Sequence, residues 1–159
     1  MNWEKWLDKW NMTALNIKTP FLDMEWKPGD EDKTAAWELY IELLTRITTQ
    51  SISADHGDEK TALTSISSIF GLTRDVIKNN GRHCIEFTKI AVVVLNQVIR
   101  PFTTKWHGLS LDGAFENTES CLEFRRELEE LQSVLRVYTK MLADMAGVED
   151  LTELESDKK

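Results

Sequence analysis

The chain has 159 residues, of which 42% are hydrophobic and 29% charged, and its formal net charge is −8. This length predicts one domain that buries a core of its own without disulfides or metal. The acidic charge argues against non-specific binding to nucleic acid or anionic lipid, because both depend on Lys and Arg. It suits a soluble protein or one with a basic partner.

The cysteines and the apolar runs indicate which kinds of protein this sequence does not resemble. Cys84 and Cys121 form no CxxC motif, so we expect two reduced thiols, no structural zinc and a cytoplasmic location. The start of the chain, MNWEKWLDKW, has no apolar core typical of a signal peptide. No apolar run approaches the roughly 20 residues that a membrane span needs.

The first predicted element is a short helix over residues 3–14. Trp3, Leu7 and Trp10 share one face of this helix, with Trp6 at its edge. An isolated helix this short is marginal in water, so its tryptophans need a cover. Three covers are open: the body of the same chain, a groove on a partner protein, or a membrane surface. The mixed charge of the polar face disfavours the membrane.

A connector is predicted over residues 15–31. Pro20 and Pro28 interrupt regular structure there. Because a structureless loop of this length is uncommon, we expect its apolar side chains to pack on the rest of the chain. Those side chains are Phe21, Leu22 and Trp26.

Two helices follow, over residues 31–50 and 58–79, as apolar spacing of three and four residues predicts. Asp30 or Asp32 can cap the first, and Asp58 the second. The inner face of the first is expected to consist of Trp37, Tyr40, Ile41, Leu44 and Ile47.

The most apolar run of the chain, IAVVVL, predicts a central helix over residues 83–107. Pro101 should kink or break it, because proline removes a backbone donor and clashes with the preceding turn. The polar residues of this helix recur at spacings of four, three and four, which places them on one face. They are Asn96, Arg100, Thr103 and His107.

Two roles are open for this polar stripe. It can be a seam that faces solvent, or it can meet a partner inside or outside the bundle. Within the bundle, Arg100 would reach a carboxylate such as Glu42 or Asp75, a pair that would specify register more than stability.

A final helix is predicted over residues 119–146, ended by Gly147. Together the elements predict an all-α fold, an antiparallel four-helix-type bundle of long helices joined by short loops. We expect three segments. They are a Trp-rich helix and connector packed on the bundle (1–30), the bundle itself (31–147), and an acidic, partly frayed tail (148–159).

The sequence contains no recognisable catalytic or metal-binding constellation. It has no HExxH or ExxH pair, no Gly-rich phosphate loop and no GxSxG motif. We therefore expect no metal, no cofactor and no catalysis by this chain alone.

The stretches AAWELYIELLTR and VLNQVIRPFTTKWHG resemble small helical proteins encoded beside larger effectors in bacterial operons. The resemblance names no family. It implies a subunit of something larger, for example of a bacterial multi-gene defence-type system.

Our leading functional prediction is a non-catalytic interaction, adaptor or regulatory subunit of a larger assembly. One candidate surface is the Trp helix, and the other is the polar stripe of the central helix. Two alternatives remain: a homo-oligomer that pairs through apolar faces, and a small-ligand sensor with a pocket near Arg100 and Trp106. The candidate partner-binding residues are Trp3, Trp6, Leu7, Trp10, Asn96, Arg100, Thr103 and His107.

Overall fold

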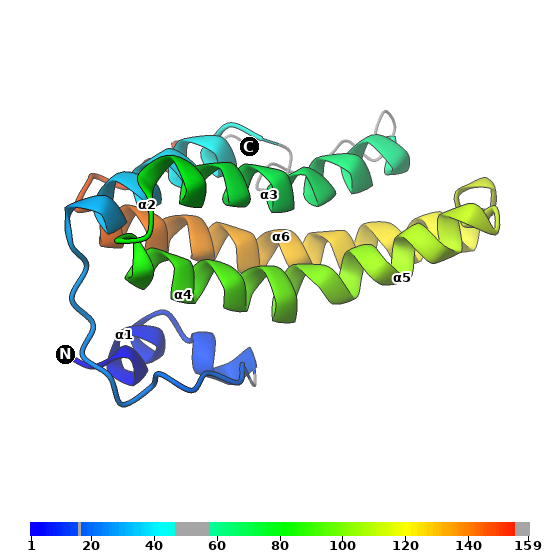
Figure 1. Ribbon diagram of the computed structural model, residues 1–159. Helices are drawn as coiled ribbons and strands as arrows, with labels where there is room; N and C mark the ends of the chain where they lie inside the picture. Colours follow the sequence, from blue (N-terminus) through cyan, green and yellow to red (C-terminus); the bar gives the residue numbers. More distant parts are fainter. Residues whose placement is uncertain (16, 47–57, 155–159) are drawn as a thin grey trace.

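The computed structural model describes residues 1–15, 17–46 and 58–154 (Figure 1). These residues form helices and their connections, with one isolated antiparallel bridge between Asn2 and Glu25. The predicted all-α class is confirmed. None of the helices in the described ranges is long and apolar enough to cross a membrane.

The N-terminal layer consists of helix α1 (Trp3–Lys9) and a 3-10 turn (Met12–Leu15). The Asn2 side chain caps α1 by accepting a hydrogen bond from the Lys5 N–H. The helix is shorter than predicted because Asn11 adopts a positive φ of 57°. A left-handed residue cannot continue a right-handed helix, and asparagine tolerates that conformation.

The connector after this layer folds back along α1. Its path is fixed by three backbone hydrogen bonds, from Trp3 N–H to Met24, from Glu4 N–H to Leu22 and from Trp26 N–H to Met1. In Figure 1 the N-terminal layer lies along one side of α4.

Helix α2 (Asp30–Leu44) begins with a carboxylate that serves two helices. The Asp32 side chain is only 2% exposed. One of its oxygens accepts the Gly29 N–H at 2.8 Å and the other accepts the Phe87 N–H at 2.9 Å. Asp32 therefore satisfies an otherwise unpaired donor at the start of α2 and another at the start of α4.

The inner face of α2 differs from the prediction. It is formed by Asp32, Ala35, Ala36, Leu39, Tyr40 and Leu43. Trp37 and Ile41, predicted as core, are exposed. Small alanines allow α2 to approach α6 closely, and the apolar pattern gives little weight to alanine. The predicted end of this helix, including Ile47, lies outside the described residues.

Helix α3 (Glu59–Asn80) begins and ends close to the predicted positions. Asp58 accepts hydrogen bonds from the Lys60 and Thr61 N–H groups, and Gly81 ends the helix with a φ of 82°. The buried face of α3 carries Ala62, Leu63, Ile66, Ile69, Thr73 and Val76.

The predicted central helix is present, with an irregular middle. Helix α4 (Ile85–Val93) continues into a π-helical segment (Val94–Ile99) and then into α5 (Arg100–Leu111). Pro101 lies in the first turn of α5. A wider turn before a proline relieves its clash with the preceding carbonyl and accommodates its missing N–H, so we ascribe the π segment to Pro101.

Helix α6 (Thr118–Ala146) is the longest helix of the described residues. Asn117 caps its start and Gly147, with a φ of 72°, ends it. In Figure 1 α6 runs behind α3 and the α4–α5 helix, and it packs mainly on α2. After Gly147 the chain turns back to α2, where the Leu151 N–H donates to the Tyr40 hydroxyl at 2.6 Å. The tail beyond Leu154 lies outside the described residues.

Replacing Asp32 tests its double role. Asp32→Ala removes the acceptor for the buried Phe87 N–H and the part-buried Gly29 N–H, so we expect the free energy of unfolding to fall by about 2–4 kcal/mol. Urea denaturation measures this change. Asp30→Ala is the matched control, because it removes the same charge from an exposed position of the same helix turn. A loss for Asp32→Ala no larger than that of the control would contradict the double cap.

Candidate functional site

The tryptophans of α1 point into the molecule. Trp3, Trp6 and Leu7 are at most 2% exposed. The Trp3 indole N–H donates to Glu86 of α4 at 2.8 Å, and the Trp6 indole N–H donates to Asp144 near the end of α6 at 2.8 Å. The apolar face of α1 therefore packs on the rest of the same chain, and not on a partner groove or a membrane.

Aromatic stacking reinforces this docking. Trp6 stacks on Trp26 of the connector, with ring centroids 4.8 Å apart, and Trp3 meets Phe21 edge-on at 4.8 Å. Trp10 is half-buried, and the Lys9 ammonium lies 5.2 Å from its ring centroid. A partner could reach Trp3, Trp6 and Leu7 only after this layer had left the bundle.

The polar stripe of the central helix lies along α3. His107 Nε2 is 2.8 Å from the Ser67 hydroxyl, and the Arg100 guanidinium lies 4.7 Å from the centre of the Phe70 ring. Arg100 Nε also donates to Asn96 at 3.1 Å. Thr103 is buried and donates to the Arg100 carbonyl. Asn96, Arg100 and His107 are exposed, so the stripe forms the outer edge of the seam between α3 and α5.

The carboxylate partners suggested for Arg100 are placed elsewhere. Glu42 pairs with Arg46, which follows the end of α2, at 2.8 Å. Asp75 is exposed on α3 and borders a groove that faces α2. Arg100 itself is exposed and contacts Asn96 and Phe70. The hypothesis of a buried Arg100 ion pair is wrong, because Arg100 stays at the surface and stacks on an aromatic ring.

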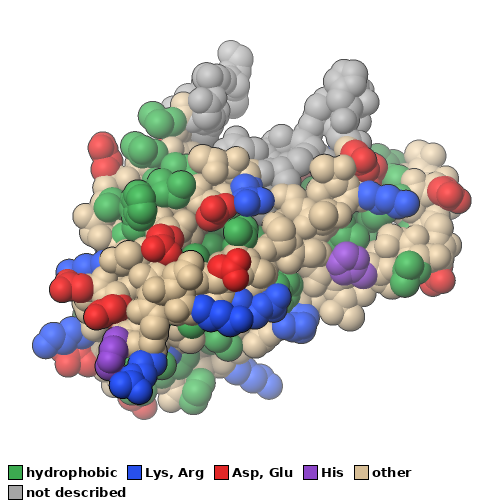
Figure 2. Space-filling model, turned by 45° about the horizontal axis from the view of Figure 1, so that its top comes forward, with side chains coloured by type: hydrophobic (Ala, Val, Ile, Leu, Met, Phe, Trp, Pro, Cys, Tyr) green, Lys and Arg blue, Asp and Glu red, His purple; other side chains and the backbone are tan. Residues whose placement is uncertain are grey.

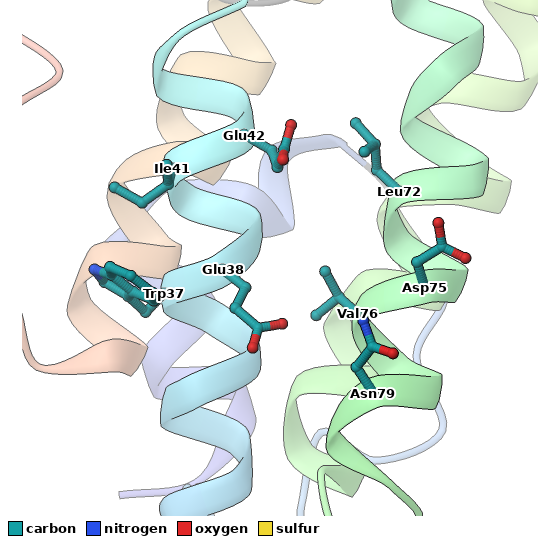
Figure 3. A pocket seen from close by; sticks show the side chains of 8 residues that line it. All are labelled: Trp37, Glu38, Ile41, Glu42, Leu72, Asp75, Val76 and Asn79. Carbon is teal, nitrogen blue, oxygen red and sulfur yellow. The ribbon is translucent and has the colours of Figure 1, made fainter.

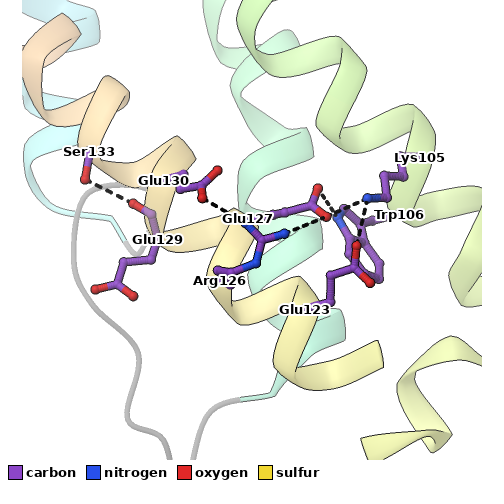
Figure 4. Close-up of polar contacts among 8 residues, drawn as sticks. All are labelled: Lys105, Trp106, Glu123, Arg126, Glu127, Glu129, Glu130 and Ser133. Carbon is purple, nitrogen blue, oxygen red and sulfur yellow. Dashed lines mark hydrogen bonds and ion pairs between the residues drawn. The ribbon is translucent and has the colours of Figure 1, made fainter. Parts of the chain in front are cut away.

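The Trp106 ring is enclosed by side chains, and a groove lined in part by Pro101, Phe102 and Lys105 lies nearby on the same helix. Trp106 is 1% exposed and packs against Phe115 and Phe124, with ring centroids 6.0 Å and 5.1 Å away. Its indole N–H donates to Glu127 at 3.3 Å, and Lys105 bridges Glu127 and Glu123 (Figure 4). Trp106 therefore acts as a core residue at the far end of the bundle.

The hydrogen bonds of this network shift the pKa values of Glu127 and Lys105. Burial alone would raise the pKa of Glu127, but hydrogen bonds from Lys105 and Trp106 outweigh it and hold the pKa below its usual value. The hydrogen bond to Glu127 raises the pKa of Lys105. Both groups are therefore charged at neutral pH.

A groove lined by apolar and acidic side chains lies between α2 and α3. It encloses about 380 Å³. Trp37 is 49% exposed and Ile41 is 39% exposed. Figure 2 shows hydrophobic side chains and acidic side chains next to one another on the face that α2 and α3 share. The residues that line the groove are Trp37, Glu38, Ile41, Glu42, Leu72, Asp75, Val76 and Asn79.

The acidic side chains of this groove lie between its two helices. In Figure 3, Glu38 and Glu42 extend from α2 toward Leu72 and Val76 of α3. Glu38 accepts a hydrogen bond from the Asn80 amide at 3.0 Å. The groove thus has an apolar floor and ridge with carboxylates among them.

The helical spacing of the sequence predicted Trp37 and Ile41 as core residues, so this groove was not among the predicted sites. A usable signal was present: both apolar residues are followed by glutamate, at Glu38 and Glu42, so apolar and acidic stripes run side by side. That pattern indicates a surface stripe when another face of the helix can supply the core contacts.

No protein-family model, no curated protein and no solved structure matches the chain. Within the ranges that the structure describes, no group of three or more His, Cys, Asp or Glu side chains could hold a metal ion. Cys84 is a buried free thiol, and burial raises the pKa of the half-buried Cys121 thiol. The raised pKa of Cys121 is the opposite of what a nucleophilic thiol needs.

Two tryptophan substitutions test the burial pattern. Trp6→Ala removes a buried ring and leaves a cavity, so we expect it to cost about 3–5 kcal/mol of unfolding free energy. Trp37→Ala should cost less than about 1 kcal/mol, because half of the ring is already in water. Chemical denaturation of both variants measures this. Equal losses would contradict the inward position of α1 or the outward position of Trp37.

The Glu127 network predicts a pH dependence with a definite sign. Since the pKa of Glu127 is lower in the folded state, its charge stabilises the fold above the unfolded-state pKa of about 4.3, and this contribution disappears as the pH falls through the folded-state value. We expect wild type to exceed Glu127→Gln in stability at about pH 7 and to match it at about pH 3.

Urea titrations at both pH values test this, with Glu130→Gln as the exposed control that shows little pH-dependent difference. A gap between wild type and Glu127→Gln that stays constant or widens on acidification would contradict the assignment.

Proposed function

We propose that this protein is a non-catalytic interaction subunit, an adaptor or regulator, whose protein partner docks in the α2–α3 groove. One observation carries the proposal: Trp37 stands half-exposed beside Ile41 on a helix whose inner face is already filled by other residues. Tryptophan supplies a large contact area and is enriched among the residues that dominate binding energy. A partner that covered Trp37 would remove this apolar surface from water.

The packing of the helices that carry the groove supports a rigid docking surface. We infer that α2, α3, the α4–α5 helix and α6 form an antiparallel four-helix-type bundle. Packing of α2 on both α3 and α6, and of α3 on α5, favours this arrangement. Helices held from several sides present their outer side chains in a fixed geometry, which lowers the entropic cost of binding.

The two surfaces suggested by the sequence are weaker candidates. Docking through Trp3, Trp6 and Leu7 requires release of a layer that is hydrogen-bonded to α4 and α6. The polar stripe keeps Asn96, Arg100 and His107 accessible, but these contact one another or α3. The α2–α3 groove requires no rearrangement.

A different protein fits the groove better than a second copy of this chain. In a symmetric dimer through this surface the same patch faces itself. Glu38, Glu42 and Asp75 would then meet their own equivalents, and facing like charges are unfavourable. The larger assembly is proposed to lie in the cytoplasm of a bacterium, which the two free thiols, Cys84 and Cys121, support in part.

Capture from the native cells tests the proposal. Tagged wild type is expected to retain a stoichiometric partner, and Trp37→Ala or Ile41→Glu is expected to lose it. Truncation of an anchor tryptophan costs about 2 kcal/mol or more, which is roughly a 30-fold loss of affinity. Leu122→Ala is the matched control, because Leu122 is 63% exposed on α6, away from the groove.

Circular dichroism of each variant shows that the fold is retained. Undiminished capture by folded Trp37→Ala and Ile41→Glu would refute the groove as the interface. A wild-type protein that elutes alone would refute the proposed subunit role.

A further inference from the structure

We infer that the occupant of the α2–α3 groove is an amphipathic helix with basic flanks, contributed by the partner. This inference rests on the proposed function and specifies the chemistry of the partner at that site.

The charges that line the groove favour a cationic occupant. The eight lining residues include Glu38, Glu42 and Asp75 and contain no Lys or Arg. Arg46 pairs with Glu42. In the part of the chain that the structure describes, Glu38 and Asp75 have no Lys or Arg within ion-pair distance, and Glu38 is bonded to the neutral Asn80 amide. Two carboxylates are therefore available to a cation that a partner brings.

The backbone of the groove favours a helix over an extended segment. Both walls are α-helices, in which backbone donors and acceptors are paired within each helix. A peptide that binds as an added β-strand pairs its backbone with a sheet edge, and these walls offer none. A helix pairs its backbone internally and binds through side chains alone, so it can lie in the groove without leaving buried polar groups unpaired.

The spacing of the lining residues sets the pattern of the occupant. On α3 the lining runs from Leu72 to Asn79, which is about two helical turns or roughly 10 Å. A third helix packed there would present apolar residues three, four and seven positions apart. Figure 3 shows Trp37 and Ile41 on the side of α2 away from α3, with Glu38 and Glu42 between them and Leu72, so the apolar stripe would contact Trp37 and Ile41.

Basic residues of the occupant would flank that apolar stripe. Glu38 extends from α2 toward α3 and Asp75 lies on α3 (Figure 3), so Lys or Arg on the α3 side of the stripe could reach either carboxylate. An arginine could also stack on the exposed Trp37 ring. Acidic peptides and nucleic acids carry the wrong charge for this surface.

Two synthetic peptides serve as probes. Each has about 18 residues and the same leucine stripe, and the polar face carries lysine in one and glutamate in the other. Fluorescence anisotropy measures their binding to full-length protein. We expect the lysine peptide to bind at least about 10-fold more tightly than the glutamate peptide, because opposite charges attract and like charges repel.

Charge-neutralised variants locate the binding. The double variant Glu38→Gln with Asp75→Asn is expected to lower the affinity for the lysine peptide about 5- to 10-fold at about 0.05 M salt. The loss should be much smaller at about 0.5 M salt, where charges are screened. Trp37→Ala should weaken it at both salt concentrations. Glu129→Gln with Glu130→Gln removes the same net charge from the exposed side of α6 and is the matched control.

Two outcomes would overturn the inference: equal binding of the two peptides, or equal weakening by the groove pair and the α6 pair. The same groove pair, applied to capture from native cells, separates the two proposals. If Trp37→Ala loses the partner while Glu38→Gln with Asp75→Asn keeps it at full strength, the subunit role stands and the basic helix is refuted. If Trp37→Ala also keeps the partner, both are refuted.

Discussion

The hydrogen bond from the Phe87 N–H to the buried Asp32 carboxylate determines which side of α2 faces the core. Asp32 shares its helix face with Ala35, Ala36, Leu39 and Leu43, three, four, seven and eleven residues later. Anchoring Asp32 at the start of α4 therefore turns this whole face inward. Trp37 follows five residues after Asp32, about 140° around the helix, and is carried to the surface. With this rotation of α2, Trp37 and Ile41 lie at the groove.

The N-terminal layer shows the opposite use of tryptophan. Trp3 and Trp6 bury their rings and satisfy their indole N–H groups on Glu86 and Asp144. These two buried indole N–H groups thus have partners, as a stable core favours. Trp37 has neither a buried ring nor a role in this docking. That contrast within one chain is the physical basis for assigning the former to folding and the latter to recognition.

Local chemistry made much of the fold predictable. The caps at Asp58 and Asn117 and the helix ends at Gly81 and Gly147 depend on nearby residues, so the sequence revealed helix positions. The site was not predictable in this way. The rotation of α2 depends on Phe87, which lies 55 residues from Asp32. Apolar periodicity assigned the larger Trp37 and Ile41 to the core in place of the small alanines. It also gives no signal for the π-helical segment before Pro101.

Hydroxyl-radical footprinting with mass spectrometry tests the central claim most directly, because it reports the accessibility of each tryptophan ring. In the isolated protein we predict fast oxidation of Trp37 and strong protection of Trp3, Trp6 and Trp106. In the complex captured from native cells, Trp37 should become protected while the other three stay unchanged. Protection of Trp37 in the isolated protein, or equal oxidation of Trp37 in both samples, would contradict the account.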